Sequence, residues 1–142
     1  MFNPTREQSR TFLFDVWEKH RTSAALSPLE ALALSIVLEH PEYHAVLGDR
    51  DRYLDREWKP EGGETNPFLH LSLHLAIEEQ RSIDQPPGIR AAIDALEARR
   101  GAHDARHAVM DCLAEVIWQA QRHGTGFDNA VYLDCIARKR DT

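Results

Sequence analysis

The chain has 142 residues, of which 17 are basic and 23 acidic, so its formal net charge at neutral pH is −6. This length suits one domain with a single hydrophobic core. The sequence has no concentrated run of Lys and Arg that would favour nucleic acid, and no apolar run long enough for a membrane span or a signal peptide. We therefore expect a cytoplasmic protein that binds neither nucleic acid nor membrane. A protein partner or a homo-oligomer is compatible with the sequence but not indicated by it.

The two cysteines, Cys112 and Cys135, lie in apolar segments with helical periodicity and do not form a Cys-x-x-Cys pair. Such a pattern indicates neither a disulfide framework nor a thiolate zinc site. It predicts two buried thiols in the reduced state.

Two helices are predicted in the first 40 residues. Asn3 followed by Pro4 predicts the start of a helix that runs to about His20. The run from Ser27 to Glu30 has the pattern of a capping box and starts a second helix, which should end near His40 because the next residue is a proline.

A short element at residues 40–47 precedes a charged segment at residues 48–65. Charges of alternating sign surround Tyr53, Leu54 and Trp58, and Pro60, with two glycines, interrupts regular structure. We expect a long, mostly irregular loop whose aromatic residues hold it over the domain. It would serve either as a lid or as a docking surface.

The stretch that begins at Asn66 is the most distinctive in the chain. Asn66 is a favourable N-cap and Pro67 suits the first helical position. The following residues are apolar around nearly the whole helical wheel, which predicts a surrounded helix in the middle of the molecule. The run from Asp84 to Gly88 should end this helix.

Three further helices follow. Pro87 is the predicted start of a shorter helix that ends at Gly101, and the next helix spans 102–123. Asp128 is the predicted N-cap of the last helix, with Phe127 and Tyr132 spaced as a hydrophobic staple. No strand pattern occurs. The expected fold is all-α: a single domain over residues 1–142, built as an irregular bundle of about five to six helices with a long charged loop.

Within the apolar stretch, His70, His74 and Glu78 recur every fourth residue, so they share one stripe of the predicted helix. A buried carboxylate requires a partner, because an unpaired buried charge is strongly unfavourable. The stripe should therefore meet a metal ion, a cation or a hydrogen-bonding network.

A second His-x-x-x-His pair, His103 and His107, lies in the helix predicted at 102–123, where Asp111 and Glu115 follow at the same spacing. Imidazoles and carboxylates on facing helices are typical ligands of zinc, iron or manganese. The sequence thus predicts an iron or zinc site between helices, with the carboxylates as bridges or general bases. Its expected ligands are His70, His74, Glu78, His103, His107 and His44.

Other interpretations remain open at this point. His103 and His107 lie on the side of their helix away from its aliphatic stripe and could face water. His40 and His44 could be a helix-end residue and an exposed ring. The histidines could belong to a structural polar network in a non-enzymatic interaction or regulatory module, or to a metal-free acid–base enzyme. The reaction, hydrolytic or oxygen-dependent, is not indicated.

Several motifs resemble a small bacterial family catalogued as domain of unknown function 1841. The resemblance covers nearly the whole chain and is carried by Phe2-Asn3-Pro4, His40-Pro41-Glu42-Tyr43-His44, the run from Asn66 through Ile89, and His103 through Gln121. It implies no particular activity.

A second resemblance is to hemerythrin-like bundles, which carry a lone His, His-x-x-x-Glu, His-x-x-x-His and His-x-x-x-x-Asp in this order. The corresponding residues here are His44, His74 with Glu78, His103 with His107, and His123 with Asp128. The last pair spans Gly124-Thr125-Gly126, whereas the family's pair lies on a helix, and His70 has no counterpart in the family's pattern. The resemblance implies a metal-binding bundle.

Overall fold

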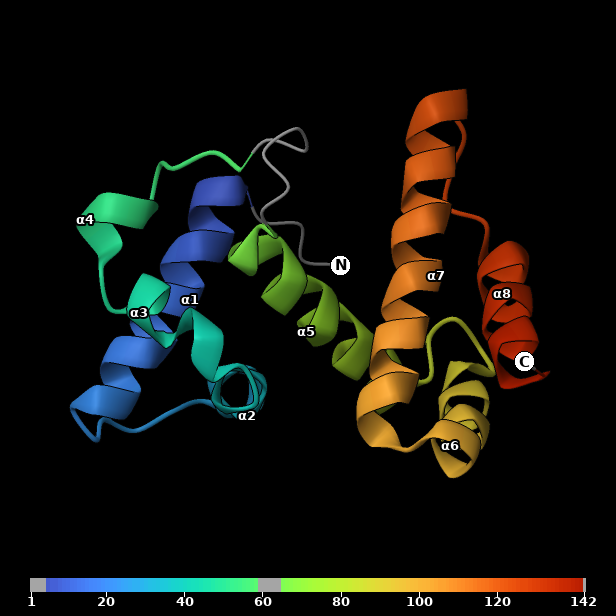
Figure 1. The fold of residues 1–142 in the computed structure, drawn as a ribbon, viewed down its shortest axis with the longest axis horizontal. Helices are drawn as coiled ribbons and strands as arrows, with labels where there is room; N and C mark the ends of the chain where they lie inside the picture. The colour runs from blue at the N-terminus through green and yellow to red at the C-terminus, as the bar shows by residue number, and fades with distance from the viewer. Residues whose placement is uncertain (1–4, 59–64, 142) are drawn as a thin grey trace. The chain divides into compact units, whose positions relative to one another are not determined.

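The computed structural model describes residues 5–58 and 65–141, and within these ranges all regular structure is helical, without strands (Figure 1). The all-α prediction is confirmed. The described residues form eight α-helices rather than five to six, because the short element expected at residues 40–47 contains α3 and the segment expected to be a loop contains α4. The elements are α1 (Arg6–Arg21), α2 (Pro28–Leu38), the 3₁₀-helix η1 (Pro41–Tyr43), α3 (His44–Leu47), α4 (Arg50–Tyr53), α5 (Pro67–Ile83), α6 (Ile89–Arg100), α7 (Ala102–His123) and α8 (Asn129–Asp141).

The chain divides into two compact units, Met1–Leu75 and Ala76–Thr142. Helix α5 contains residues of both units. That the two units behave as one domain stays a prediction. None of the described helices has the length and apolarity of a membrane span.

In the first unit, side-chain caps fix the starts of both long helices. Thr5 is the N-cap of α1 and forms a capping box with Gln8. The predicted start, Asn3 and Pro4, lies outside the described residues. Ser27 and Glu30 form the predicted capping box of α2. Each box satisfies two backbone groups that the first turn of a helix leaves without a partner.

The core of the first unit consists of apolar side chains from α1, α2, α3 and α5. Phe14 of α1 contacts Phe68 of α5 with ring centroids 5.3 Å apart. The other buried members are Leu13, Ile36, Val37, Leu47 and Leu71. This packing attaches the N-terminal part of α5 to α1 and α2, and so fixes the position of the two histidines that this part of α5 carries.

The charged segment is partly helical, since it contains α4. Its described part is tied to α1 by Arg10, which is only 2% exposed. The guanidinium donates to the backbone carbonyls of Tyr53, Leu54 and Arg56, and it lies 5.2 Å from the ring centroid of Trp58. The segment therefore covers the core as expected up to Trp58. Residues 59–64 lie outside the described part of the chain, so a lid or docking role stays a prediction.

Helix α5 begins as predicted but is less enclosed than predicted. Asn66 accepts hydrogen bonds from the backbone N–H groups of Phe68 and Leu69, which confirms it as the N-cap. However, Leu69 is 57% exposed, whereas Leu71 and Ile77 are each only 1% exposed. The expectation of a helix surrounded on all sides is wrong. A buried stripe with the usual spacing of three and four residues packs inward, and apolar residues outside it face solvent.

In the second unit, α6 starts at Ile89, two residues later than predicted. Its N-cap is Gly88, which has a left-handed φ of 99° that a proline start would not provide. The carboxylate of Asp84 accepts hydrogen bonds from the N–H groups of Gly88 and Arg90 and so caps the first turn. These bonds, the one from Arg90 first, lower the pKa of Asp84.

The last two helices follow the sequence prediction. Helix α7 has the predicted bounds and ends at Gly124, whose φ is 63°. Asp128 accepts from the N–H of Val131 and caps α8, while Phe127 contacts Tyr132 with ring centroids 5.4 Å apart. Tyr132 is fully buried and its hydroxyl donates to Gln80 at 2.7 Å. This bond and the ring contact attach the start of α8 to the rest of the second unit.

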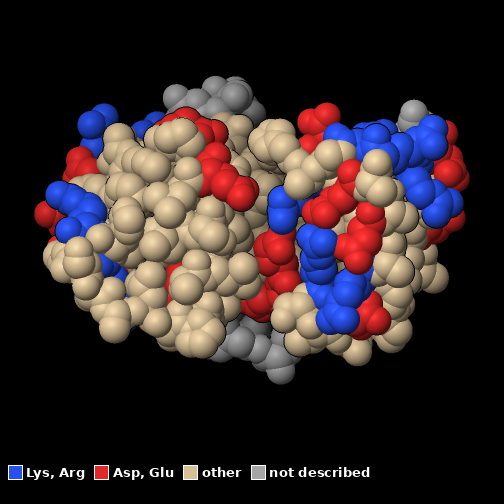
Figure 2. Space-filling model, turned by 90° about the horizontal axis from the view of Figure 1, so that it is seen from below, with Lys and Arg blue, Asp and Glu red and all other residues tan. Residues whose placement is uncertain are grey.

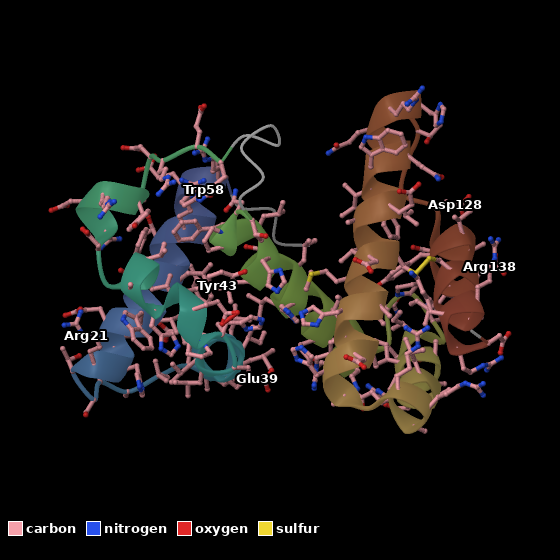
Figure 3. The ribbon with its side chains drawn as sticks, viewed as in Figure 1. Arg21, Glu39, Tyr43, Trp58, Asp128 and Arg138 are labelled. Atoms are coloured by element: carbon pink, nitrogen blue, oxygen red, sulfur yellow. A yellow bond between two sulfur atoms is a disulfide. The ribbon has the colours of Figure 1, made fainter. Side chains whose placement is uncertain are left out.

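The two cysteines form a disulfide between α7 and α8, visible as the yellow bond between these helices in Figure 3. The prediction of two reduced thiols is therefore wrong. Sequence spacing could not reveal the pair, because Cys112 and Cys135 are 23 residues apart and meet only after α7 and α8 pack against each other. The Cα–Cα distance of 5.8 Å is typical of a disulfide.

Candidate metal centre

Three histidines of the first unit converge at one point. His40 lies between α2 and η1, directly before Pro41, while His70 and His74 lie one turn apart on α5. Each offers a ring nitrogen, and these nitrogens lie within 4.8 Å of one another. The ring centroid of His40 is 4.7 Å from that of His74 and 5.1 Å from that of His70. We refer to His40, His70 and His74 as the three-histidine cluster.

His40 is 4% exposed, and its two ring nitrogens have different surroundings. Nδ1 lies 2.7 Å from the carbonyl oxygen of Ile36, which can only accept, so Nδ1 carries the proton. Nε2 is then the lone-pair nitrogen, and it is buried without a hydrogen-bond partner. A metal ligand of this type typically donates its other N–H to a backbone carbonyl, which fixes the tautomer and the ring orientation.

The pair on α5 presents two nitrogens at a ligand-like spacing. The Nε2 atoms of His70 and His74 are 3.2 Å apart. Two nitrogens bound at 2.0–2.1 Å to one tetrahedral zinc ion would lie about 3.3–3.4 Å apart. His74 is 4% exposed, and His70 is half-buried. The i, i+4 spacing read from the sequence therefore does bring these two rings together.

The structure does not bring His44 into this cluster. Its Nε2 lies 2.8 Å from the carbonyl oxygen of Val37, and its ring packs on Trp17 with centroids 4.3 Å apart. These contacts attach η1 and α3 to α2 and α1. His44 is therefore engaged in a structural role in this conformation.

Glu78 meets a cation rather than a histidine. Its carboxylate forms an ion pair with Arg106 of α7, with the two atoms 2.7 Å apart, and its side chain is 16% exposed. Glu78 is partly buried rather than buried, and the expected partner of its carboxylate is an arginine. Glu97 and Arg81 extend this network within the second unit. In Figure 2, acidic and basic side chains alternate on the visible face of this unit.

The remaining predicted ligands lie on α7. The rings of His103 and His107 contact each other with centroids 4.3 Å apart. His103 is exposed and His107 half-buried, whereas Asp111 and Glu115 are both exposed. Ligand roles for His103 and His107 stay predictions.

The last element of the hemerythrin-like pattern is divided between two helices. His123 is the final residue of α7, and Asp128 uses its carboxylate to cap α8. The resemblance stays a prediction.

His40 is the site residue that sequence reasoning assigned least weight. The His-Pro dipeptide explained its position as a helix end, and its ring was not expected to reach α5. The available signal was the buried turn in which it lies, where the carbonyl of Ile36 is four residues earlier and within reach of Nδ1. Its approach to α5 depends on packing that no local pattern contains.

Among known proteins, no curated protein and no solved structure matches this chain. A family model does match, over residues 5–138. This match includes all three histidines of the cluster and nearly the whole described chain. The chain belongs to the family described as Domain of unknown function (DUF1841).

Proposed function

We propose that this protein binds a transition-metal ion through His40, His70 and His74. The observation that carries the proposal is the buried Nε2 of His40, which lacks a hydrogen-bond partner in a cluster of three converging imidazoles. A buried polar atom without a partner is unfavourable by about 1–3 kcal/mol. A metal ion would satisfy it.

The donor set favours zinc over iron. Three neutral imidazoles suit zinc, copper, nickel or iron, but the cluster has neither the carboxylates of di-iron bundles nor thiolates. Glu78, the nearest carboxylate on the same stripe of α5, is paired with Arg106. Zinc held by three histidines would keep a fourth position for water or another ligand.

Zinc bound in such an open site would lower the pKa of a coordinated water to about 7, the chemistry that hydrolysis requires. The protein's own contribution is to orient the imidazoles. The carbonyl of Ile36 does this for His40, because it accepts a hydrogen bond from Nδ1 and leaves Nε2 to face the cluster as the donor atom.

The test is elemental analysis by mass spectrometry on protein without a histidine tag, as isolated and after reconstitution with zinc and ferrous iron. We expect about one equivalent of zinc in the native protein. His40→Ala and His74→Ala should each lose it, with circular dichroism showing unchanged helical content. His20→Ala is the matched control, because His20 is an exposed histidine of the same unit.

Failure of the native protein to bind either metal after reconstitution would overturn the proposal. The three-histidine cluster would then be a structural polar network, as expected for a non-enzymatic interaction module. Binding that survives both His40→Ala and His74→Ala would place the metal elsewhere.

A further inference from the structure

We propose that Tyr43 positions the imidazoles of His40 and His70 for metal binding. The inference rests on the proposed metal site. Tyr43 ends η1, three residues after His40, and its backbone N–H donates to the carbonyl of His40 at 3.0 Å. This hydrogen-bonded turn fixes the position at which the Tyr43 side chain leaves the backbone, relative to the His40 ring.

The Tyr43 ring contacts two imidazoles that come from different elements. It is nearly parallel to His40, with an interplanar angle of 3° and centroids 5.7 Å apart. It meets His70 of α5 edge to face, at 69° and 5.8 Å. In Figure 3, Tyr43 is labelled close to α5. The Tyr43 ring therefore sets the tilt of the His40 ring and limits the rotation of the His70 ring.

The arrangement matters because the two imidazoles are held differently. His40 is already fixed by the carbonyl of Ile36 and by burial. His70 is half-buried, and its ring contacts those of His40, Tyr43 and His74. Without the Tyr43 ring, His70 would lose one of these contacts, and water would gain access to the face of its ring.

Burial, followed by the charge of Glu42, raises the pKa of the Tyr43 phenol, so the hydroxyl stays protonated at neutral pH. The ring also packs against the core of the first unit. Tyr43 thus acts on the metal through other residues, as a positioning residue, and its aromatic ring rather than its hydroxyl carries the effect.

Three variants separate positioning from general packing. Tyr43→Phe keeps the ring and removes the hydroxyl, whereas Tyr43→Leu removes the ring and keeps an apolar side chain. Tyr53→Leu is the matched control, because Tyr53 is also half-buried and packs against the same core, but its ring contacts Trp58. Tyr43→Met, with its flexible side chain, replaces Tyr43→Leu if that variant does not fold.

The zinc dissociation constant is measured by competition with a chromophoric chelator, and the visible absorption of the cobalt(II)-substituted protein reports ligand geometry. We expect Tyr43→Leu to bind zinc about 10–100-fold more weakly and to change the cobalt spectrum, as loss of a supporting residue does at other metal sites. Tyr43→Phe and Tyr53→Leu should stay close to the native protein in both measurements.

The outcomes are distinguishable. If the native protein binds no zinc, the proposed function is overturned, and this inference fails with it. Native binding together with equal affinity and spectrum in Tyr43→Leu and Tyr53→Leu overturns the role of Tyr43 alone and keeps the metal site. A loss in Tyr43→Phe as large as in Tyr43→Leu would assign the effect to the hydroxyl and also overturn positioning by the ring.

Discussion

Reduction of the disulfide between Cys112 and Cys135 should destabilise the second unit substantially. The bond joins residues 23 positions apart and so restricts the unfolded chain. In the chain-entropy description, a closed loop of this length removes about 11 cal/mol/K from the unfolded state, or about 3.4 kcal/mol at 25 °C. With a urea m-value of about 1–3 kcal/mol/M, the midpoint of unfolding should fall by about 1–3 M.

The assay is urea unfolding followed by circular dichroism at 222 nm, with and without a phosphine reductant. Mass spectrometry after alkylation in denaturant confirms the state of both thiols. Cys112 is completely buried, so reduction changes the covalent link without changing the side chains in the core. A Cys112→Ala/Cys135→Ala variant should show a lower midpoint that the reductant does not change. An unchanged midpoint in fully reduced native protein would refute the reasoning.

Four further predictions test the packing and the site. Leu71→Ala should destabilise the protein by about 2–5 kcal/mol in urea unfolding, because Leu71 is 1% exposed in the core; a change under about 1 kcal/mol would contradict this packing. Arg10→Met should lower the stability by at least about 1.5–3 kcal/mol, because three carbonyls lose a charged donor, and near-UV circular dichroism should show altered packing of Trp58; an unchanged spectrum would argue against the anchor. Asp84 has a lowered pKa, so its contribution to stability is complete above the unfolded-state pKa of about 3.9 and is lost as the pH falls through the folded-state value. Asp84→Asn should therefore weaken the acid dependence of the melting temperature while keeping the cap, whereas Asp84→Ala should lower the melting temperature at neutral pH. Zinc at 100 times its dissociation constant should stabilise the native protein by about 2.7 kcal/mol, measured by thermal unfolding before and after a chelator, and should leave His40→Ala unchanged.

Local signals in the sequence predicted most helix boundaries. The capping box at Ser27, the cap at Asn66, the end of α7 at Gly124 and the cap at Asp128 each depend on a few neighbouring residues, and each is present in the structure. Where the prediction differed, at the start of α6, the cap depends on the carboxylate of Asp84 reaching forward by six residues to the N–H of Arg90. Such a hydrogen bond forms only when the whole turn is folded, so it corresponds to no simple residue spacing in the sequence.

The candidate site was predictable only in part, for a related reason. The spacing of His70 and His74 placed two imidazoles on one face of a helix, and the structure has them 3.2 Å apart. The third imidazole comes from His40, 30 positions earlier, and joins them only because α2 and α5 contribute to the same core. Glu78 shared the predicted stripe, yet its partner Arg106 was not identified, since ion-pair partners on separate helices have no local pattern.

Helix α5 belongs to both compact units, and this has a consequence for dissecting the protein into fragments. The division falls between Leu75 and Ala76, inside a helix that runs from Pro67 to Ile83. Cleavage there would leave each half with a short, frayed piece of helix, because a few residues cannot maintain helical hydrogen bonding alone. Fragments that overlap, one ending after Ile83 and one beginning at Asn66, would each keep the entire helix. A gene fusion, a protease site or a split reporter inserted at the boundary would instead separate His74 from Glu78.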